Sequence, residues 1–213
     1  MALESWTARL HFAPRSPFAR KVLAALVVCG LESRVSLVQV DPWTEERLRT
    51  LNPLCKVPVL ELSTGLLLYD SPVIARFLHE SSGGKLLPAD ERAWDALRRE
   101  ALGDSLAEAV IRRYVETLGP SHDRIGKVIR RQEAAISAVL DHLESVALRW
   151  AGWPADIGHL AIAAALDYLL VRSPELRWDE GRPLLGKWFC DFRHHPCMRV
   201  AAAPGSGNFR LAE

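Results

Sequence analysis

The chain has 213 residues, 49% of them hydrophobic and 25% charged, which is close to the average of globular proteins and excludes a wholly disordered chain, a collagen and a coiled-coil rod. Its 27 basic residues balance 26 acidic ones, and the net charge of +1 gives no support to a nucleic-acid partner, which requires a basic excess. The longest uncharged apolar stretch, 22–31, is half the roughly 20 residues that a membrane span needs, so no membrane partner is expected.

A strand and then a helix are predicted at the start of the chain. Residues 8–12 alternate apolar and polar side chains, as a half-buried strand does. Ser16 and Pro17 then precede an apolar run that stops at Gly30. Serine is a preferred N-cap, proline fits the first helical position and glycine fits the C-terminal stop, so the pattern predicts a helix that ends at Cys29.

The alternation of strands and helices continues to about residue 80. Apolar runs between turn residues indicate strands, and a second Ser-Pro pair repeats the helix start. In chain order the predicted elements are a strand at 35–40, a short polar helix at 44–51, a hairpin of two strands at 57–62 and 66–69 around Ser63-Thr64-Gly65, and a helix from Ser71 to about His79. The order βαβαββα predicts an α/β sheet domain over residues 1–80.

Only helices are predicted after a small, polar, Gly-rich linker. Apolar residues spaced by three or four, beginning at Trp94, mark one face of each long helix. Asp156 is expected to cap an almost wholly apolar helix that forms the buried centre of an all-α domain over 90–213. The predicted segments are a linker at 81–89, helices at 94–114, 125–146, 157–171 and 183–192, and an extended tail from Pro204.

The segment Ser16-Pro17-Phe18-Ala19 is the first candidate for chemistry. In the simplest interpretation Ser16 is only a helix cap. The free N–H groups and the dipole of a helix N-terminus also favour an anion, however, and a hydroxyl there can donate a hydrogen bond to a bound thiolate. The two roles are compatible.

The second candidate surrounds Pro58, at the start of a predicted strand, where proline removes a ladder donor. A cis bond at an exposed sheet edge is one solution, and it would turn the N–H and C=O of Val57 toward an extended peptide. The alternative is an ordinary edge-strand proline.

The third candidate is Asp70-Ser71 at a helix start, which by itself indicates a helix cap. Adjacent aspartate and serine also suit a free amino-acid head group. The hydroxyl and N–H of Ser71 would bind the carboxylate, and Asp70 would bind the ammonium group.

Together, in this order and on this βαβαββα frame, the segments resemble those of the cytosolic glutathione transferases. Ser16-Pro17-Phe18-Ala19 is similar to the omega-type Cys-Pro-Phe-Ala motif with serine in the cysteine's place, and to bacterial members with Ser-Pro-Phe-x-Arg-Lys. Residues 52–60 resemble the family's cis-proline loop, with Cys55 where relatives usually have glycine. Residues 155–167 resemble its capping-box helix, although His159 replaces the acidic residue that makes the reciprocal bond of the box.

The resemblance implies a fold, a co-substrate and a set of site residues. The fold is a thioredoxin-like N-terminal domain followed by an all-helical bundle, and the protein is expected to be a homodimer. The co-substrate is glutathione. Asp70 and Ser71 would hold its γ-glutamyl head, the Val57 backbone beside Pro58 its cysteine and Lys56 its glycine end, while Ser16 would stabilise the thiolate.

A small electrophile is the implied second substrate, because a thiolate is a nucleophile. Phe18 is expected both to bind glutathione and to line the electrophile pocket. The other expected lining residues are Phe12, Leu106, Val110 and Tyr114.

The implied function is conjugation or reduction of a small electrophile with glutathione. The alternative is a non-catalytic binding or regulatory protein of the same fold, like stringent-starvation-type relatives. Serine at position 16 argues against thiol–disulfide exchange, which needs a protein sulfur. Cys55 could in principle substitute for it.

The cysteines and the N-terminus favour a cytoplasmic protein with reduced thiols. The four cysteines form no CxxC motif, and the N-terminus lacks the basic and apolar regions of a signal peptide. Cys190, His194, His195 and Cys197 cluster as zinc ligands can. Since no second ligand pair stands at a finger-like spacing, no metal is predicted.

Overall fold

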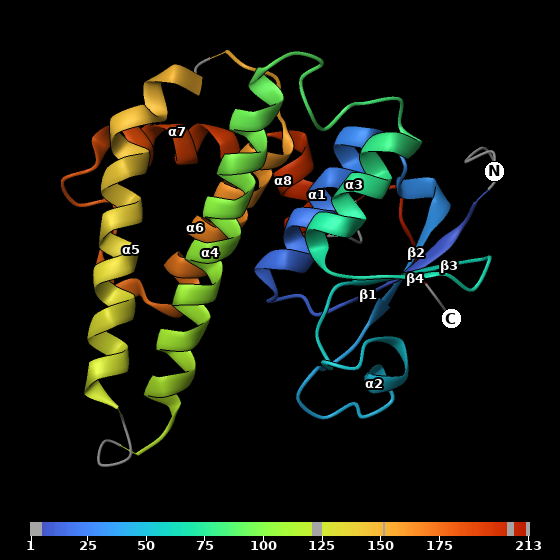
Figure 1. Ribbon diagram of the computed structural model, residues 1–213, viewed down its shortest axis with the longest axis horizontal. Coiled ribbons are helices and arrows are strands. Elements are labelled where there is room, and N and C mark those ends of the chain that lie inside the picture. The colour runs from blue at the N-terminus through green and yellow to red at the C-terminus, as the bar shows by residue number, and fades with distance from the viewer. Residues whose placement is uncertain (1–5, 121–124, 151, 204–206, 212–213) are drawn as a thin grey trace.

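The computed structural model describes residues 6–120, 125–150, 152–203 and 207–211. It has two parts that lie side by side, a sheet with its covering helices and a group of longer helices (Figure 1). The thioredoxin-like sheet part and the helical part confirm the predicted fold class. The domain boundaries at residues 80 and 90 stay predictions.

The predicted strands and helices occur in the predicted order, together with a few short elements that were not predicted. The first part consists of β1 (Ala8–Phe12), α1 (Pro17–Cys29), the 3-10 helix η1 (Glu32–Arg34), β2 (Val35–Gln39), α2 (Leu48–Leu51), β3 (Val59–Leu62), β4 (Leu67–Leu68) and α3 (Ser71–Ser81). The second part consists of α4 (Arg92–Leu118), α5 (Gly126–Val146), η2 (Ala147–Trp150), α6 (Ile157–Arg172), η3 (Pro174–Leu176), α7 (Pro183–Arg193) and α8 (Pro196–Ala202). The last strand is β5 (Arg210–Leu211).

The strands form one sheet in the order β4-β3-β1-β2-β5. β1 runs parallel to β2 and antiparallel to β3, so Ala8 stands between Val35 and Leu62. β3 and β4 form the predicted hairpin. Within 207–211, the expected extended tail ends in β5, which pairs in parallel with the edge strand β2.

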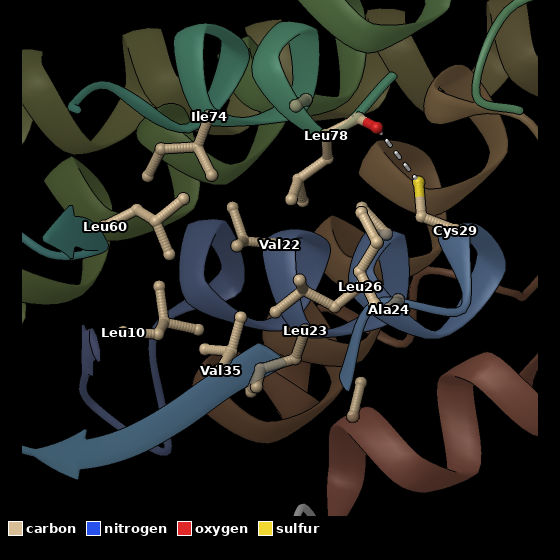
Figure 2. Packing of buried hydrophobic residues seen from close by; sticks show 14 of the residues in the cluster. Leu10, Val22, Leu23, Ala24, Leu26, Cys29, Val35, Leu60, Ile74 and Leu78 are labelled. Carbon is tan, nitrogen blue, oxygen red and sulfur yellow. Dashed lines mark hydrogen bonds between the residues drawn. The ribbon is translucent and has the colours of Figure 1, made fainter. Parts of the chain in front are cut away.

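Helix α1 packs on the sheet because one of its faces is wholly apolar. Its ends are as predicted: the side chain of Ser16 caps the first turn, and Gly30 ends the helix in the left-handed conformation at φ 69°. Figure 2 shows side chains of α1 packed between the sheet and α3. The labelled residues of this core are Leu10, Val22, Leu23, Ala24, Leu26, Cys29, Val35, Leu60, Ile74 and Leu78.

Two local predictions in the first part were wrong in detail. The helix expected at 44–51 is reduced to α2, because the Asp41 carboxylate accepts a hydrogen bond from the N–H of Trp43 at 2.9 Å and a turn takes the place of the first half. The N-cap of α3 is Asp70 rather than Ser71. The Asp70 carboxylate accepts a hydrogen bond from the Ser71 N–H, so Ser71 lies inside the first turn.

Helix α6 is the buried centre of the helical part, as its lack of a polar face predicted. It approaches α4 closely at Gly103, where an added Cβ would lie 2.6 Å from the Ala161 carbonyl carbon. At its start, the N–H of His159 donates to Asp156 at 3.0 Å and the Asp156 N–H donates to the His159 ring at 3.3 Å. The capping box is therefore complete, with histidine in the acidic residue's role.

Two further features of the second part differ from expectation. Trp94 is 77% exposed, because α6 begins to cover α4 only at Ala96, whose carbonyl lies beside Gly158. Helix α8 was not predicted at all. It packs against α1, and its buried residues Met198 and Ala201 belong to the core of the sheet part. Within the described residues, none of the helices is both long and apolar enough to cross a membrane.

Candidate functional site

The strand register brings the three candidate segments to one end of the sheet. β3 is antiparallel to β1 and pairs His11 with Val59, so the loop before β3 meets the end of β1 from which α1 starts. β3 and β4 pair Leu60 with Leu68, so the chain leaves β4 beside the start of β3 and enters α3 there. The segments around Ser16, Pro58 and Ser71 therefore share this end.

Ser16 has a structural role and, among the residues that the structure describes, its hydroxyl hydrogen has no acceptor. Its half-buried hydroxyl oxygen accepts a hydrogen bond from the Ala19 N–H at 3.2 Å. A hydroxyl that accepts in this way keeps its own hydrogen for another acceptor. An anion in front of α1 would receive that hydrogen bond in addition to the favourable end of the helix dipole.

The loop before β3 leaves main-chain groups available at Val57. Among the described residues, its N–H and C=O have no hydrogen-bond partner, and the bond to Pro58 is cis, which is one of the two alternatives that the sequence left open. Asn52 stabilises the loop, because its side-chain amide donates a hydrogen bond to the Lys56 carbonyl at 3.0 Å. Cys55 adopts φ 53°, in the left-handed region that favours glycine. Lys56 is exposed.

The start of α3 carries a buried hydroxyl that lacks a partner. Ser71 is 0% exposed, and no hydrogen bond satisfies its Oγ among the described residues. Asp70, whose peptide bond to Tyr69 is cis, is exposed beside it. An unsatisfied buried hydroxyl is costly. Its place at a helix N-terminus suits it to donate to a carboxylate.

A charged cluster that was not predicted from the sequence lies between α1 and α4. Lys21 of α1 is 0% exposed, and its Nζ lies 3.0 Å from Glu100 and 2.6 Å from Asp104 of α4. Burial raises the pKa of Asp104 to about 6, against the opposing charge of Lys21 and with help from the charges of Glu100 and Asp70. One signal was available: Lys21 interrupts an apolar helix, and the two carboxylates stand four residues apart on α4.

The Asp104→Asn variant is expected to gain stability relative to the wild type as the pH rises. The pKa of Asp104 is raised from 3.8 to about 6 in the folded protein, so the protonated carboxyl stabilises the fold below pH 4 and this contribution is lost as pH rises through about 6. Asparagine cannot ionise. The difference in the free energy of unfolding between variant and wild type should therefore grow by about 2 kcal/mol from pH 4 to 7. Urea unfolding of both proteins at several pH values measures it, and a difference that stays constant contradicts the assignment.

A small cleft opens beside Ser16, between the start of α1 and the face of α6. It is lined by Pro14, Arg15, Ser16, Pro17, Arg20, Ala164, Asp167, Tyr168, Val171 and Arg172. Three arginines and one aspartate make it positively charged. Burial raises the pKa of Asp167, against the charges of Arg20 and Arg193, and burial also lowers the pKa of Arg20.

The expected lining of the electrophile pocket was largely wrong. Phe12 is buried in the core of the sheet part, and Leu106 and Val110 are buried in the core of the helical part. Phe18 is partly buried and packs against the helical core. Only Tyr114 lies near the cleft, where its hydroxyl accepts a hydrogen bond from Arg172 at 2.9 Å. Helical spacing cannot distinguish a pocket from a core.

The cysteine and histidine cluster near α7 makes local contacts. The His194 ring lies 2.6 Å from the Cys190 carbonyl, and the His195 ring lies 3.0 Å from the Cys197 sulfur. Over the part of the chain that the structure describes, no group of three or more histidine, cysteine or acidic side chains is arranged to hold a metal ion.

The chain is similar in sequence to known proteins. A family model described as the N-terminal domain of glutathione S-transferase matches residues 15–81. The chain is 29% identical over 177 residues to the uncharacterized GST-like protein YibF of Escherichia coli (strain K12), covering 81% of this chain and 87% of that protein. The chain is also 26% identical over 200 residues to glutathione S-transferase L1 of Arabidopsis thaliana, covering 88% of this chain and 78% of that protein.

A solved structure is similar over almost the full length. It is a glutathione transferase family member from Pseudomonas fluorescens Pf-5 with bound glutathione. The TM-score is 0.86 and the sequence identity 30%, with 97% of this chain and 100% of that chain covered.

Proposed function

Since the chain belongs to the glutathione transferase family, we propose that it uses glutathione as co-substrate and transfers it to a small electrophile. The observation that carries the proposal is the Ser71 hydroxyl, which is fully buried at the start of α3 and has no partner among the described residues. A ligand carboxylate placed there would satisfy it.

Each end of the tripeptide has a matching group in this site. Ser71 binds the γ-glutamyl carboxylate, and the exposed Asp70 binds the ammonium group beside it. The main chain of Val57 pairs with the cysteine in the manner of a short β-strand. Lys56, exposed in the same loop, binds the glycine carboxylate. The unpaired main-chain groups of Val57 and the orphaned hydroxyl of Ser71 support this placement.

Ser16 is the proposed catalytic residue, acting as a hydrogen-bond donor to sulfur. When bound, glutathione supplies a thiol whose pKa is about 8.5 in water, so only a few per cent is ionised at neutral pH. Lowering that pKa by two units requires roughly 2.7 kcal/mol. A hydrogen bond to an anion contributes roughly 1.5–3 kcal/mol and a helix N-terminus about 0.3–1 kcal/mol, which together suffice.

We further propose that the protein belongs to the serine-type members marked by Ser-Pro-Phe-x-Arg-Lys, and that it does not catalyse thiol–disulfide exchange. That chemistry needs a protein sulfur at the position of Ser16. Cys55 follows α2, and its Sγ lies 3.6 Å from the carbonyl oxygen of Pro42 and 3.8 Å from that of Glu45, in the segment before α2.

A homodimer is part of the same proposal. Three apolar side chains close to Asp70 in the sequence are exposed: Leu66 at 53%, Tyr69 at 39% and Val73 at 48%. A partner surface would remove them from water.

The Ser71→Ala variant is expected to bind glutathione about 10- to 150-fold more weakly, because it loses a hydrogen bond to a charged group. Its free energy of unfolding should stay the same or rise slightly, since the lost hydroxyl has no partner among the described residues. Calorimetric titration with glutathione and urea unfolding measure the two effects.

Ser81→Ala is the matched control for that variant. Ser81 is at the other end of α3, and its Oγ is likewise buried without a partner among the described residues. Its removal should leave glutathione affinity unchanged. Equal affinity for the Ser71→Ala variant and the wild type would remove Ser71 from the site.

Turnover distinguishes the enzyme from the non-catalytic alternative. The wild-type protein is assayed with glutathione against a panel of electrophiles. Conjugation at rates above the uncatalysed reaction supports the proposal. Glutathione binding without turnover of any electrophile would favour a binding or regulatory protein of the same fold.

A further inference from the structure

The cleft beside Ser16 carries more positive charge than its one carboxylate can balance. Arg15, Arg20 and Arg172 line it together with a single carboxylate, Asp167. That carboxylate is already engaged, since its Oδ2 lies 2.8 Å from Arg20. Its Oδ1 lies 3.7 Å from Arg193. Positive charge therefore remains in excess.

Arg172 is held in a fixed position at one wall of the cleft. Its guanidinium lies 4.4 Å from the centre of the Tyr114 ring and 5.7 Å from that of Tyr168. It also donates a hydrogen bond to the Tyr114 hydroxyl at 2.9 Å. A guanidinium fixed by aromatic stacking loses little freedom when it binds a carboxylate.

The opposite wall contributes a second cation. Arg15 is exposed and directly precedes Ser16, so it stands at the mouth of the cleft beside the proposed thiolate position. The same cleft is also lined by apolar groups, among them Ala164 and Val171. This combination suits a small apolar body that carries an anionic group.

We propose that the electrophile carries a carboxylate, which Arg15 and Arg172 bind while its reactive carbon faces Ser16. The inference rests on the proposed function. There is also an electrostatic reason. A thiolate repels an anionic substrate, and two arginines that bind the substrate carboxylate offset this repulsion.

A chloronitrobenzoate and its methyl ester form the test pair. With either compound the glutathione sulfur bonds to the ring carbon that bears chlorine, chloride leaves with the bonding electron pair, and the thiol proton passes to solvent. Each kcat/KM is divided by the uncatalysed rate of the same compound, which removes their different intrinsic reactivity. The wild type is expected to prefer the acid by about 10-fold or more.

Arginine variants then locate the source of the preference. Arg172→Met and Arg15→Gln should each reduce turnover of the acid about 10-fold more than turnover of the ester, and Arg172→Lys should recover part of the preference. Arg112→Met is the matched control, since Arg112 is an exposed arginine of α4 paired with Glu108. It should change neither rate. Added salt should slow the acid more than the ester.

The possible results separate this inference from the proposed function. No binding of glutathione by the wild type refutes the proposed function. Glutathione binding and ester turnover without a preference for the acid refute only the charge selectivity. If the Arg15 and Arg172 variants instead bind glutathione more weakly and lose turnover of the acid and of the ester equally, these arginines hold the glycine carboxylate of glutathione. The inference is then wrong.

Discussion

Replacing Ser16 with alanine is expected to lower kcat/KM for glutathione conjugation about 10- to 150-fold at neutral pH. The variant loses the hydroxyl that donates to the sulfur anion, and a hydrogen bond to a charged group contributes roughly 1.5–3 kcal/mol. The pKa of the bound thiol should rise by about one to two units for the same reason. Ultraviolet absorbance of the thiolate, measured against pH, reports that pKa directly.

Two other substitutions at Ser16 separate catalysis from helix capping. The alanine variant also loses the cap on the Ala19 N–H, which costs about 0.5–2 kcal/mol of stability. Ser16→Asp keeps a capping oxygen but has no donor at neutral pH, so it should be stable and slow. Ser16→Thr keeps both the capping oxygen and the hydroxyl donor, so it should retain most of the activity. An aspartate variant as fast as the wild type would show that the hydroxyl plays no part in the reaction.

Replacing Lys21 with methionine is expected to reduce the free energy of unfolding by about 3–5 kcal/mol at pH 7. The buried ammonium group lies between two carboxylates, at 3.0 Å from Glu100 and 2.6 Å from Asp104. Without it, two negative charges are left together in a poorly solvated position. Urea unfolding monitored by tryptophan fluorescence measures the loss.

The triple variant Lys21→Met, Glu100→Gln, Asp104→Asn tests the cause. With all three charges removed, no uncompensated charge is buried and most of the lost stability should return. Lys187→Met is the control for removing a lysine, because Lys187 is 76% exposed in its pair with Asp191. It should change stability by less than about 0.5 kcal/mol. A triple variant as unstable as the single one would attribute the effect to packing.

The sequence predicts the parts of the fold that local signals determine. The Ser-Pro pairs located the starts of α1 and α3 to within one residue, because capping and proline geometry act over a single turn. The wholly apolar run after Asp156 identified the central helix α6. Each of these signals is contained in a few consecutive residues.

Elements that depend on tertiary contacts were not predictable in this way. β5 has two residues and exists through its pairing with β2. Helix α8 has seven residues and is held by its packing on α1. The lining of the cleft was missed for a similar reason, since Leu106 and Val110 satisfy the same spacing whether they face a ligand or a core. The cis Val57–Pro58 bond was expected only as one of two possibilities.

Helix α1 is attached to three neighbours through consecutive side chains. Arg20 pairs with Asp167 of α6, Lys21 with the carboxylates of α4, and Val22 packs into the core beneath α3. The helix that begins at Ser16 therefore cannot tilt toward a larger substrate without breaking all three attachments at once. During evolution, new substrate preferences in this lineage should arise by exchange of side chains along α6, such as Val171 or Arg172, while the two halves of the molecule keep their mutual orientation.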